Sequence, residues 1–310
     1  MKLKHSIFIF LLGLLVGVGV SPFANARPQE ALKAPIPATL AYMPQAVTSP
    51  SPLPQVLGAI SPAIPERTVF AEGIAEGKDG PLQAFQEESP EEISTATIAI
   101  FGDSMVDTMG TGLPYLKTVL ANYYPNVDFA LLNYGVGAQN IEAGLNRVDQ
   151  SYSYHDRNYP ALTNAGAADI VIIGSFAYNP FSDRDINYYW TKLAELVNRV
   201  RSSGKTVLLL AENAPAKAEF GTGQNGINWP QDTSWQHAQK IGQYLESTTK
   251  LALTLGVPLV DCYHPTLLSD GEGNQAYINQ ADHIHPSASG HAFIAQKIAE
   301  RIFSENMIGP

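Results

Sequence analysis

The sequence has little cysteine and little positive charge. Cys262 is the only cysteine in 310 residues, so no disulfide can form within one chain. Lys and Arg together number 19 against 29 Asp and Glu, which gives a formal net charge of −10. Basic side chains dominate the binding of nucleic acids and anionic lipids, so this balance argues against both as partners. Cys262 adjoins a predicted apolar strand, and we expect it to be buried as a small hydrophobic residue.

The N-terminus carries an apolar run that is short for a membrane span. Residues 7–20 form an uncharged run of 14 residues between Lys2 and Lys4 and the small residues of Ala24-Asn25-Ala26. A spanning helix needs roughly 20 residues. We therefore expect residues 1–26 to be a signal peptide cleaved before Arg27, with an uncleaved N-terminal anchor as the alternative and the only membrane contact. The protein would be secreted, periplasmic or in the cell envelope.

The next segment is unsuited to a packed core. Residues 27–95 hold 11 of the 22 prolines in the chain. Proline removes backbone hydrogen-bond donors and favours extended geometry. We expect this segment to be a disordered tether between the signal and a folded domain.

Apolar patterns typical of alternating strands and helices begin near residue 96 and continue to 307. Strands are expected at 97–101, 127–134, 169–173, 206–211 and 258–260. Helices are expected at 113–124, 141–148, 186–201, 237–255 and 289–303. Strands that alternate with helices form a parallel sheet covered on both faces. This predicts one three-layer α/β/α domain with a five-stranded parallel sheet over residues 96–307.

Ligand sites of open parallel sheets form beyond the carboxyl ends of the strands. Ser104 follows the first strand in the turn Gly102-Asp103-Ser104. A serine in such a turn can act as a nucleophile if a base removes its proton, and its backbone N–H can face the developing oxyanion. The alternative is an ordinary helix cap formed by Ser104 or Asp103.

The matching base lies near the C-terminus, in Asp282-His283-Ile284-His285. The spacing of three residues lets the Asp282 carboxylate hold the far nitrogen of the His285 imidazole, as nucleophilic catalysis by serine requires. In the alternative, Asp282 caps a turn and His285 is merely exposed. A metal site at His283 and His285 would lack a full ligand set, so no metal is expected.

Two further strand ends offer hydrogen-bond donors to an oxyanion. After the second strand come Gly137 and Ala138, whose backbone N–H groups are candidates, and after the third comes Asn179 with its side-chain amide. The alternatives are a simple glycine turn and an asparagine that satisfies the turn before Pro180. The glycine spacing is not that of a dinucleotide-binding loop.

These blocks, in this order, resemble those of the SGNH hydrolases, also called the GDSL esterase/lipase superfamily. The resemblance covers residues 96–307 and implies a flavodoxin-like fold, ester hydrolysis and no cofactor. It gives Ser104 the role of nucleophile, His285 that of base and Asp282 that of its partner. The backbone N–H groups of Ser104, Gly137 and Ala138 and the side-chain amide of Asn179 would form the oxyanion hole.

The chain departs from the family pattern at two positions. Ala138 stands where the second block usually ends in glycine, and Phe176 stands where the third block, G-x-N-D, has its asparagine. A backbone N–H of alanine can serve as well as that of glycine. Asn179, three residues after Phe176, is the nearest side chain that could replace the missing amide, and the loss of one donor typically costs about 10²–10³ in rate.

Aromatic residues in two loops suggest the substrate. The segment 212–235 and the region after the third strand contribute Tyr178, Phe181, Tyr188, Tyr189, Trp190, Phe220, Trp229 and Trp235. Such rings suit stacking on a sugar or the packing of a long loop. We expect an esterase that removes acetyl or other short acyl groups from a carbohydrate. The alternatives are a lipase or lysophospholipase, and a glycan-binding module or acyltransferase partner on the same fold.

Cleavage of the signal gives the first testable prediction. Protein secreted from a bacterial expression host should begin at Arg27, because the small residues Ala24 and Ala26 mark the cleavage site. Intact-mass measurement of the exported protein checks this. A mass that still includes residues 1–26 in the membrane fraction would support the uncleaved anchor instead.

Overall fold

The computed structural model describes residues 94–309, so the expected signal peptide and nearly all of the expected tether lie outside the described residues. The domain is built on one five-stranded sheet in the order β2-β1-β5-β6-β7. Every neighbouring pair in it is parallel. The strands are β1 (Ser94–Gly102), β2 (Val127–Gly135), β5 (Ile170–Gly174), β6 (Thr206–Ala211) and β7 (Leu259–Asp261). The predicted five-stranded α/β fold is confirmed.

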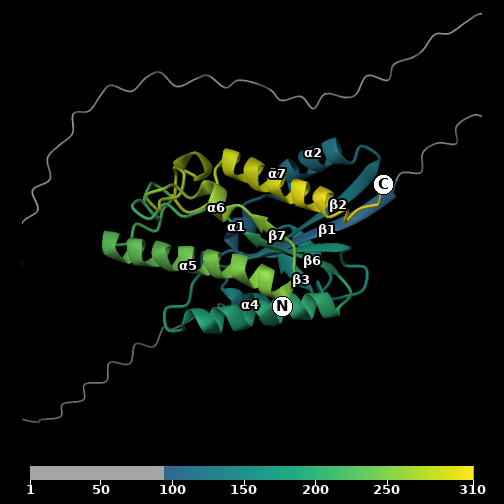
Figure 1. Cartoon of the computed structure of the whole chain (residues 1–310), viewed down its shortest axis with the longest axis horizontal. Helices are drawn as coiled ribbons and strands as arrows, with labels where there is room; N and C mark the ends of the chain where they lie inside the picture. The colour runs from purple at the N-terminus through teal and green to yellow at the C-terminus, as the bar shows by residue number, and fades with distance from the viewer. Residues whose placement is uncertain (1–93, 310) are drawn as a thin grey trace, which may run out of the picture. The chain divides into compact units, whose positions relative to one another are not determined.

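Helices cover both faces of this sheet (Figure 1). On one face α2 (Pro114–Tyr123) packs beside α7 (Ala288–Ser304). On the other face α4 (Ile186–Ser202) lies between α3 (Ile141–Arg147) and α5 (Gln231–Leu255). The three layers follow from parallel pairing, because each crossover from one strand to the next must pass over a face of the sheet.

Successive residues of the strands divide the core between these two layers. In β1, Ile98 and Ile100 join the cluster under α2 and α7, whereas Ala99 and Phe101 join the cluster under α3, α4 and α5. The two-residue period of a strand produces this division, and burial on both faces explains why the strands are almost wholly apolar. Cys262 is fully buried in the first of these clusters, as predicted.

The largest difference from the predicted elements is the start of α5. We predicted a helix from residue 237 and a loop from 212 to 235, but α5 begins at Gln231 directly after Pro230. Proline suits a helix start because its backbone has no N–H to leave unpaired there. Trp235 therefore lies in the helix, and the loop ends at residue 230. The strand β1 also begins earlier than predicted, at Ser94.

A hairpin of β3 (Tyr152–Tyr154) and β4 (Arg157–Tyr159) escaped prediction, as did α1 (Ser104–Asp107), α6 (Tyr263–Thr266) and a 3-10 turn at Gln275–Tyr277. Strands of three residues are too short to show a period. Tertiary contacts stabilise the hairpin instead: the rings of Tyr152 and Tyr159 stack with centroids 5.4 Å apart, and the Tyr152 hydroxyl donates to the Gly135 carbonyl at 2.8 Å.

No helix within residues 94–309 combines the length and apolar character needed to cross a membrane.

The two-sided core predicts an asymmetric response to truncation. Leu209 of β6 is fully buried and Leu253 of α5 is 85% exposed. Leu209→Ala should lower the free energy of unfolding by about 2–5 kcal/mol, because it leaves a cavity in the core. The matched Leu253→Ala should change it by less than about 0.5 kcal/mol. Urea denaturation followed by circular dichroism measures both, and equal effects would contradict the packing described.

Candidate active site

Ser104 lies at the carboxyl edge of the sheet, at the start of α1. Asp103 is the N-cap of this helix, and its Oδ1 accepts a hydrogen bond from the Met105 N–H at 2.9 Å. The capping alternative is therefore correct for Asp103, which leaves Ser104 free for another role. Ser104 is half-buried, and within the described residues its hydroxyl makes no hydrogen bond. The predicted contact of this hydroxyl with His285 is thus not formed in this structure.

Asp282 holds His285 in the predicted manner. The Asp282 Oδ2 lies 2.8 Å from the His285 Nδ1, and the Oδ1 accepts the backbone N–H groups of Ile284 and His285 at 2.8 and 3.0 Å. The carboxylate thus caps its turn and binds the imidazole at once, so the two alternatives from the sequence are compatible. Burial alone would raise the pKa of Asp282, but these hydrogen bonds outweigh it and hold the pKa below its usual value.

His283 points away from this pair. Its backbone has φ of 50°, and its Nδ1 lies 2.9 Å from the Thr222 hydroxyl, so the ring joins the segment 275–286 to the loop before α5. Across residues 94–309, no group of three or more His, Cys, Asp or Glu side chains could hold a metal ion.

The candidate oxyanion donors after β2 differ from each other. The Gly137 N–H donates to the Tyr154 hydroxyl at 3.3 Å, so the hairpin residue already occupies this donor. Ala138 adopts a left-handed backbone with φ of 57°, and its N–H has no acceptor in the described part of the chain. Alanine at this position therefore holds a backbone conformation that glycine adopts more readily.

Phe176 occupies the place of the family asparagine but points into the core. Its backbone is also left-handed, with φ of 57°, and its ring packs edge-on against Phe101 with centroids 5.8 Å apart. Gly144 of α3 makes room for this ring, because a Cβ there would lie 2.7 Å from the Phe176 Cζ. Phe176 can therefore offer no polar side-chain group to the site.

Asn179 reaches back to the turn that contains Ser104. Its side-chain amide donates to the Asp103 Oδ2 at 2.9 Å, which places it one residue from Ser104. The amide nitrogen carries a second N–H that this bond leaves available. The structure thus brings Asn179 and Ser104 to the same edge, although the amide now binds Asp103.

A buried carboxyl group, which the sequence analysis did not identify, binds the backbone at this edge of the sheet. Glu212 is 1% exposed, and its Oε1 accepts the Ser175 N–H at 3.0 Å while the Ser175 hydroxyl donates to its Oε2. Gly174 permits this contact, because a Cβ there would lie 2.8 Å from the Glu212 Oε1. Burial, reinforced by the charge of Asp103, raises the pKa of Glu212 to about 8. Burial also raises the pKa of Asp103 to about 6.

Two arginines fix the ends of β1 and β2. The Arg147 guanidinium donates to the carbonyl oxygens of Gly102 and Tyr134, both at 2.8 Å, and lies 3.9 Å from the centre of the Phe101 ring. Arg157 of the hairpin is 3% exposed and pairs with Asp107 of α1. These charge-assisted bonds hold the strand ends that present Ser104 and Gly137.

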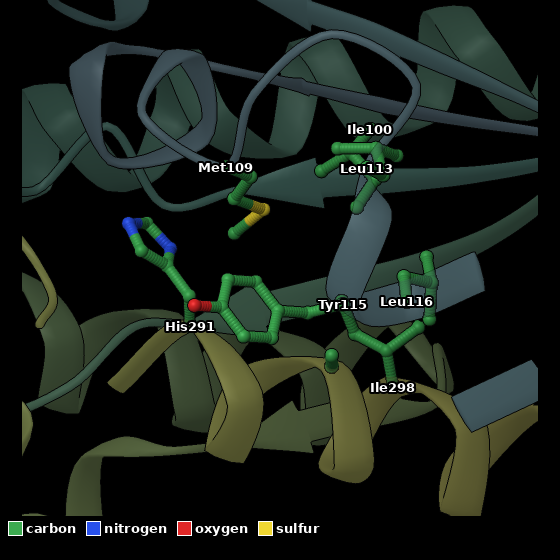
Figure 2. Close-up of a pocket in the computed structure, with 8 residues that line it drawn as sticks. Ile100, Met109, Leu113, Tyr115, Leu116, His291 and Ile298 are labelled. Atoms are coloured by element: carbon green, nitrogen blue, oxygen red, sulfur yellow. The ribbon is translucent and has the colours of Figure 1, made fainter. Parts of the chain in front are cut away.

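A hollow of about 670 Å³ opens beside His285 and Asp282 and extends along the segment 275–291 to Tyr115. A smaller pocket of about 10 Å³ shares Tyr115 and His291 with it (Figure 2). The rings of Tyr115 and His291 stack with centroids 6.2 Å apart, and the other residues lining the smaller pocket are apolar. This pocket has room for one group the size of a water or a methyl.

The supporting residues left different signals in the sequence. Glu212 follows the apolar strand 206–211 directly, and a lone acid at the end of a buried strand is a signal that could have found it. Tyr154 and Arg157 left none, since their hairpin had no detectable period.

The buried carboxyl predicts a stability that depends on pH. The unfolded chain loses the Glu212 proton near the ordinary value of 4.5, whereas the folded chain keeps it until about pH 8. The folded state binds more protons in this window, so stability falls as pH rises through it. Glu212→Gln does not titrate, and its stability relative to wild type should grow between pH 5 and pH 8 by at least about 1.4 kcal/mol, the equivalent of one pKa unit. Urea denaturation at several pH values measures this. The exposed control Glu305→Gln should keep the wild-type profile, and parallel profiles for Glu212→Gln would contradict the prediction.

Comparison with solved structures finds similar chains of low identity. A lipase/acylhydrolase from Enterococcus faecalis is 19% identical, with a TM-score of 0.47, and the match covers 68% of this chain and 96% of that one. A GDSL-like lipase from Bacteroides thetaiotaomicron is 14% identical, with a TM-score of 0.47 and coverage of 68% and 89%. An acetylxylan esterase from Geobacillus stearothermophilus is 18% identical, with a TM-score of 0.44 and coverage of 68% and 96%. No curated protein sequence matches this chain.

The family model of the GDSL-like lipase/acylhydrolases matches residues 100–293, which is more than half of the chain and runs from β1 into α7. This span contains all of the strand ends and the Asp282–His285 pair described above. The chain belongs to the GDSL-like lipase/acylhydrolase family.

Proposed function

We propose that the protein is a serine esterase that hydrolyses carboxylic esters through an acyl-enzyme, with Ser104 as nucleophile, His285 as base and Asp282 as its partner. The observation that carries the proposal is the 2.8 Å contact between the Asp282 Oδ2 and the His285 Nδ1. It fixes a proton on Nδ1 and leaves Nε2, which has no partner within the described residues, to accept one.

The first half of the reaction forms the acyl-enzyme. The Ser104 Oγ attacks the ester carbonyl carbon, and its proton passes to the His285 Nε2. The carbonyl π electrons move to oxygen, and in this proposal the N–H groups of Ser104, Ala138 and Asn179 stabilise that charge. The intermediate collapses with cleavage of the bond to the alcohol oxygen, which leaves with the proton from His285. The hydrogen bond from the Ser104 hydroxyl to His285 forms in the substrate complex, since catalytic hydrogen bonds often tighten only there.

The second half reverses these roles. Water attacks the acyl carbon and gives its proton to the His285 Nε2, and the Ser104 oxygen then leaves and takes the proton back. The carboxylic acid is released and the enzyme is restored. Asp282 keeps its negative charge throughout and stabilises the imidazolium. Gly137 can join the oxyanion hole only when its N–H exchanges the Tyr154 hydroxyl for the substrate oxygen.

For the substrate we propose a short acyl ester, acetyl above all, on a carbohydrate. The hollow beside His285 is lined mostly by polar residues, among them Gln275, Asn279 and Gln280, and so lacks the apolar channel that a long acyl chain would need. The larger hollows are lined by mixed polar and aromatic residues, as sugars prefer. Both observations favour this substrate over the lipid esters of a lipase or lysophospholipase.

We further propose that the protein acts outside the cytoplasm, either secreted, in the periplasm or in the cell envelope. The N-terminal pattern in residues 1–26 supports this. The excess of acidic residues supports partners other than nucleic acid.

The glycan-binding module remains the competing function, and Phe176 is the observation behind it. With an apolar residue in place of the third-block asparagine and Gly137 bound to Tyr154, the oxyanion hole has fewer free donors than the family pattern offers. A module of this kind would bind sugar esters without cleaving them.

Hydrolysis of p-nitrophenyl acetate by the full chain discriminates between the two. The wild-type protein should hydrolyse it, and Ser104→Ala should lower kcat by at least about 10³-fold, because no other group can form the acyl-enzyme. Ser202→Ala, an exposed serine at the end of α4, is the control and should retain wild-type activity.

Asp282→Asn should lower kcat by about 10²–10⁴-fold without unfolding the domain, since the imidazole loses its orienting charge. A wild-type protein with a native circular dichroism spectrum but no turnover would favour the binding module.

A further inference from the structure

A second large hollow has in its lining two residues that lie close in sequence to candidate oxyanion donors. It has a volume of about 660 Å³ and is lined by Asn140, Pro180, Arg184, Trp229, Gln236 and His237 among others. We call it the Trp229 groove. Asn140 is two residues from Ala138, and Pro180 directly follows Asn179. The chain therefore connects the lining of the groove closely to two candidate oxyanion donors.

The groove presents one aromatic ring to solvent from a rigid support. Trp229 is 41% exposed. Its ring meets the His237 ring nearly at right angles, with centroids 5.1 Å apart and planes at 73°. His237 in turn packs on the buried Phe220 at 5.3 Å, and its Nε2 lies 3.3 Å from the Tyr178 carbonyl oxygen. An aromatic face held in this way is a platform on which a flat ligand can stack at little entropic cost.

Unpaired polar groups surround this platform. The side chains of Thr233 and Gln236 and the Nδ2 of Asn140 make no hydrogen bond with other described residues. These hydroxyl and amide groups donate and accept, and so they match the hydroxyl groups of a sugar.

Charges along the groove balance. Glu142 and Asp183 contribute two carboxylates, and Arg184 and Lys240 contribute two cations. The Lys240 ammonium is already engaged by the Phe181 carbonyl oxygen and the Glu142 carboxylate by the Tyr188 hydroxyl. The groove therefore has no excess charge to attract an anion or a cation, which favours a neutral ligand.

We propose that the Trp229 groove binds the sugar that carries the acyl ester, with Trp229 stacked on the face of one pyranose ring. The inference rests on the proposed esterase function and deepens it, because it assigns the sugar, which is the alcohol part of the ester, to the Trp229 groove. In this assignment the end of the sugar near Asn140 and Pro180 carries the ester and faces Ser104.

Kinetics on two esters with the same acetyl group test the assignment. The full-chain protein is assayed on p-nitrophenyl acetate, which has no sugar, and on acetylated xylo-oligosaccharides. Trp229→Ala should raise KM for the sugar ester about tenfold or more and lower the ratio of kcat/KM between sugar ester and p-nitrophenyl acetate by the same factor. Trp229→Phe, which keeps an aromatic face, should recover most of this ratio. The matched control is Trp235→Ala, since Trp235 is 39% exposed but does not line the groove, and it should leave the ratio unchanged.

The outcomes separate this inference from the esterase proposal. Failure of the wild-type protein to hydrolyse p-nitrophenyl acetate overturns the esterase proposal itself. Wild-type turnover of p-nitrophenyl acetate with an unaltered ratio in Trp229→Ala overturns only the groove assignment. An equal loss on both esters, with an unchanged melting temperature, would also overturn it, as would a loss in Trp229→Ala of binding to phosphatidylcholine vesicles, which would make the groove a lipid contact.

Discussion

The parallel register of five strands is the constraint on which the rest of this molecule depends. The pairing of β1 with β2 runs from Ser94 opposite Val127 to Gly102 opposite Gly135, so these two strands end together. The pairings of β1 with β5 and of β5 with β6 bring Gly174 and Ala211 to the same edge. Ser104, Gly137, Asn179 and Glu212 come from four different strands, and only this shared edge makes them neighbours.

Two buried carboxyl groups at this edge lower the stability of the fold when they are ionised, but they also fix the positions of the loop residues that they bind. Asp103 and Glu212 are both almost inaccessible to solvent, so burial raises the pKa of each, and the charge of Asp103 raises the pKa of Glu212 further. In return, Asp103 orients Asn179, and Glu212 holds Ser175 in the loop between them. Buried polar groups of this kind are tolerated where hydrogen bonds satisfy them, and they are concentrated where a site needs fixed directions.

The sequence was sufficient for the sheet because apolar strands and helical periods are local signals. It was also sufficient for the Asp282–His285 contact, because a spacing of three residues in one turn leaves few other arrangements. It was insufficient for α5, where the only sign of six further helical residues is Pro230, and for the β3–β4 hairpin, whose tyrosines are ordered by contacts with Gly135 and with one another. The direction of Phe176 into the core depends on the absence of a side chain at Gly144, 32 positions earlier, and no local pattern records it.

The start of β1 and the end of the chain after α7 lie together, on the edge of the sheet away from the site (Figure 1). Ser94 and Thr95 share a surface hollow of about 240 Å³ with Met307, Ile308 and Gly309. The two ends of the described domain are therefore close together, although four helix-containing crossovers separate them along the chain. A short linker across this hollow would allow the domain to be circularly permuted, with new ends opened in a surface turn such as that between β3 and β4.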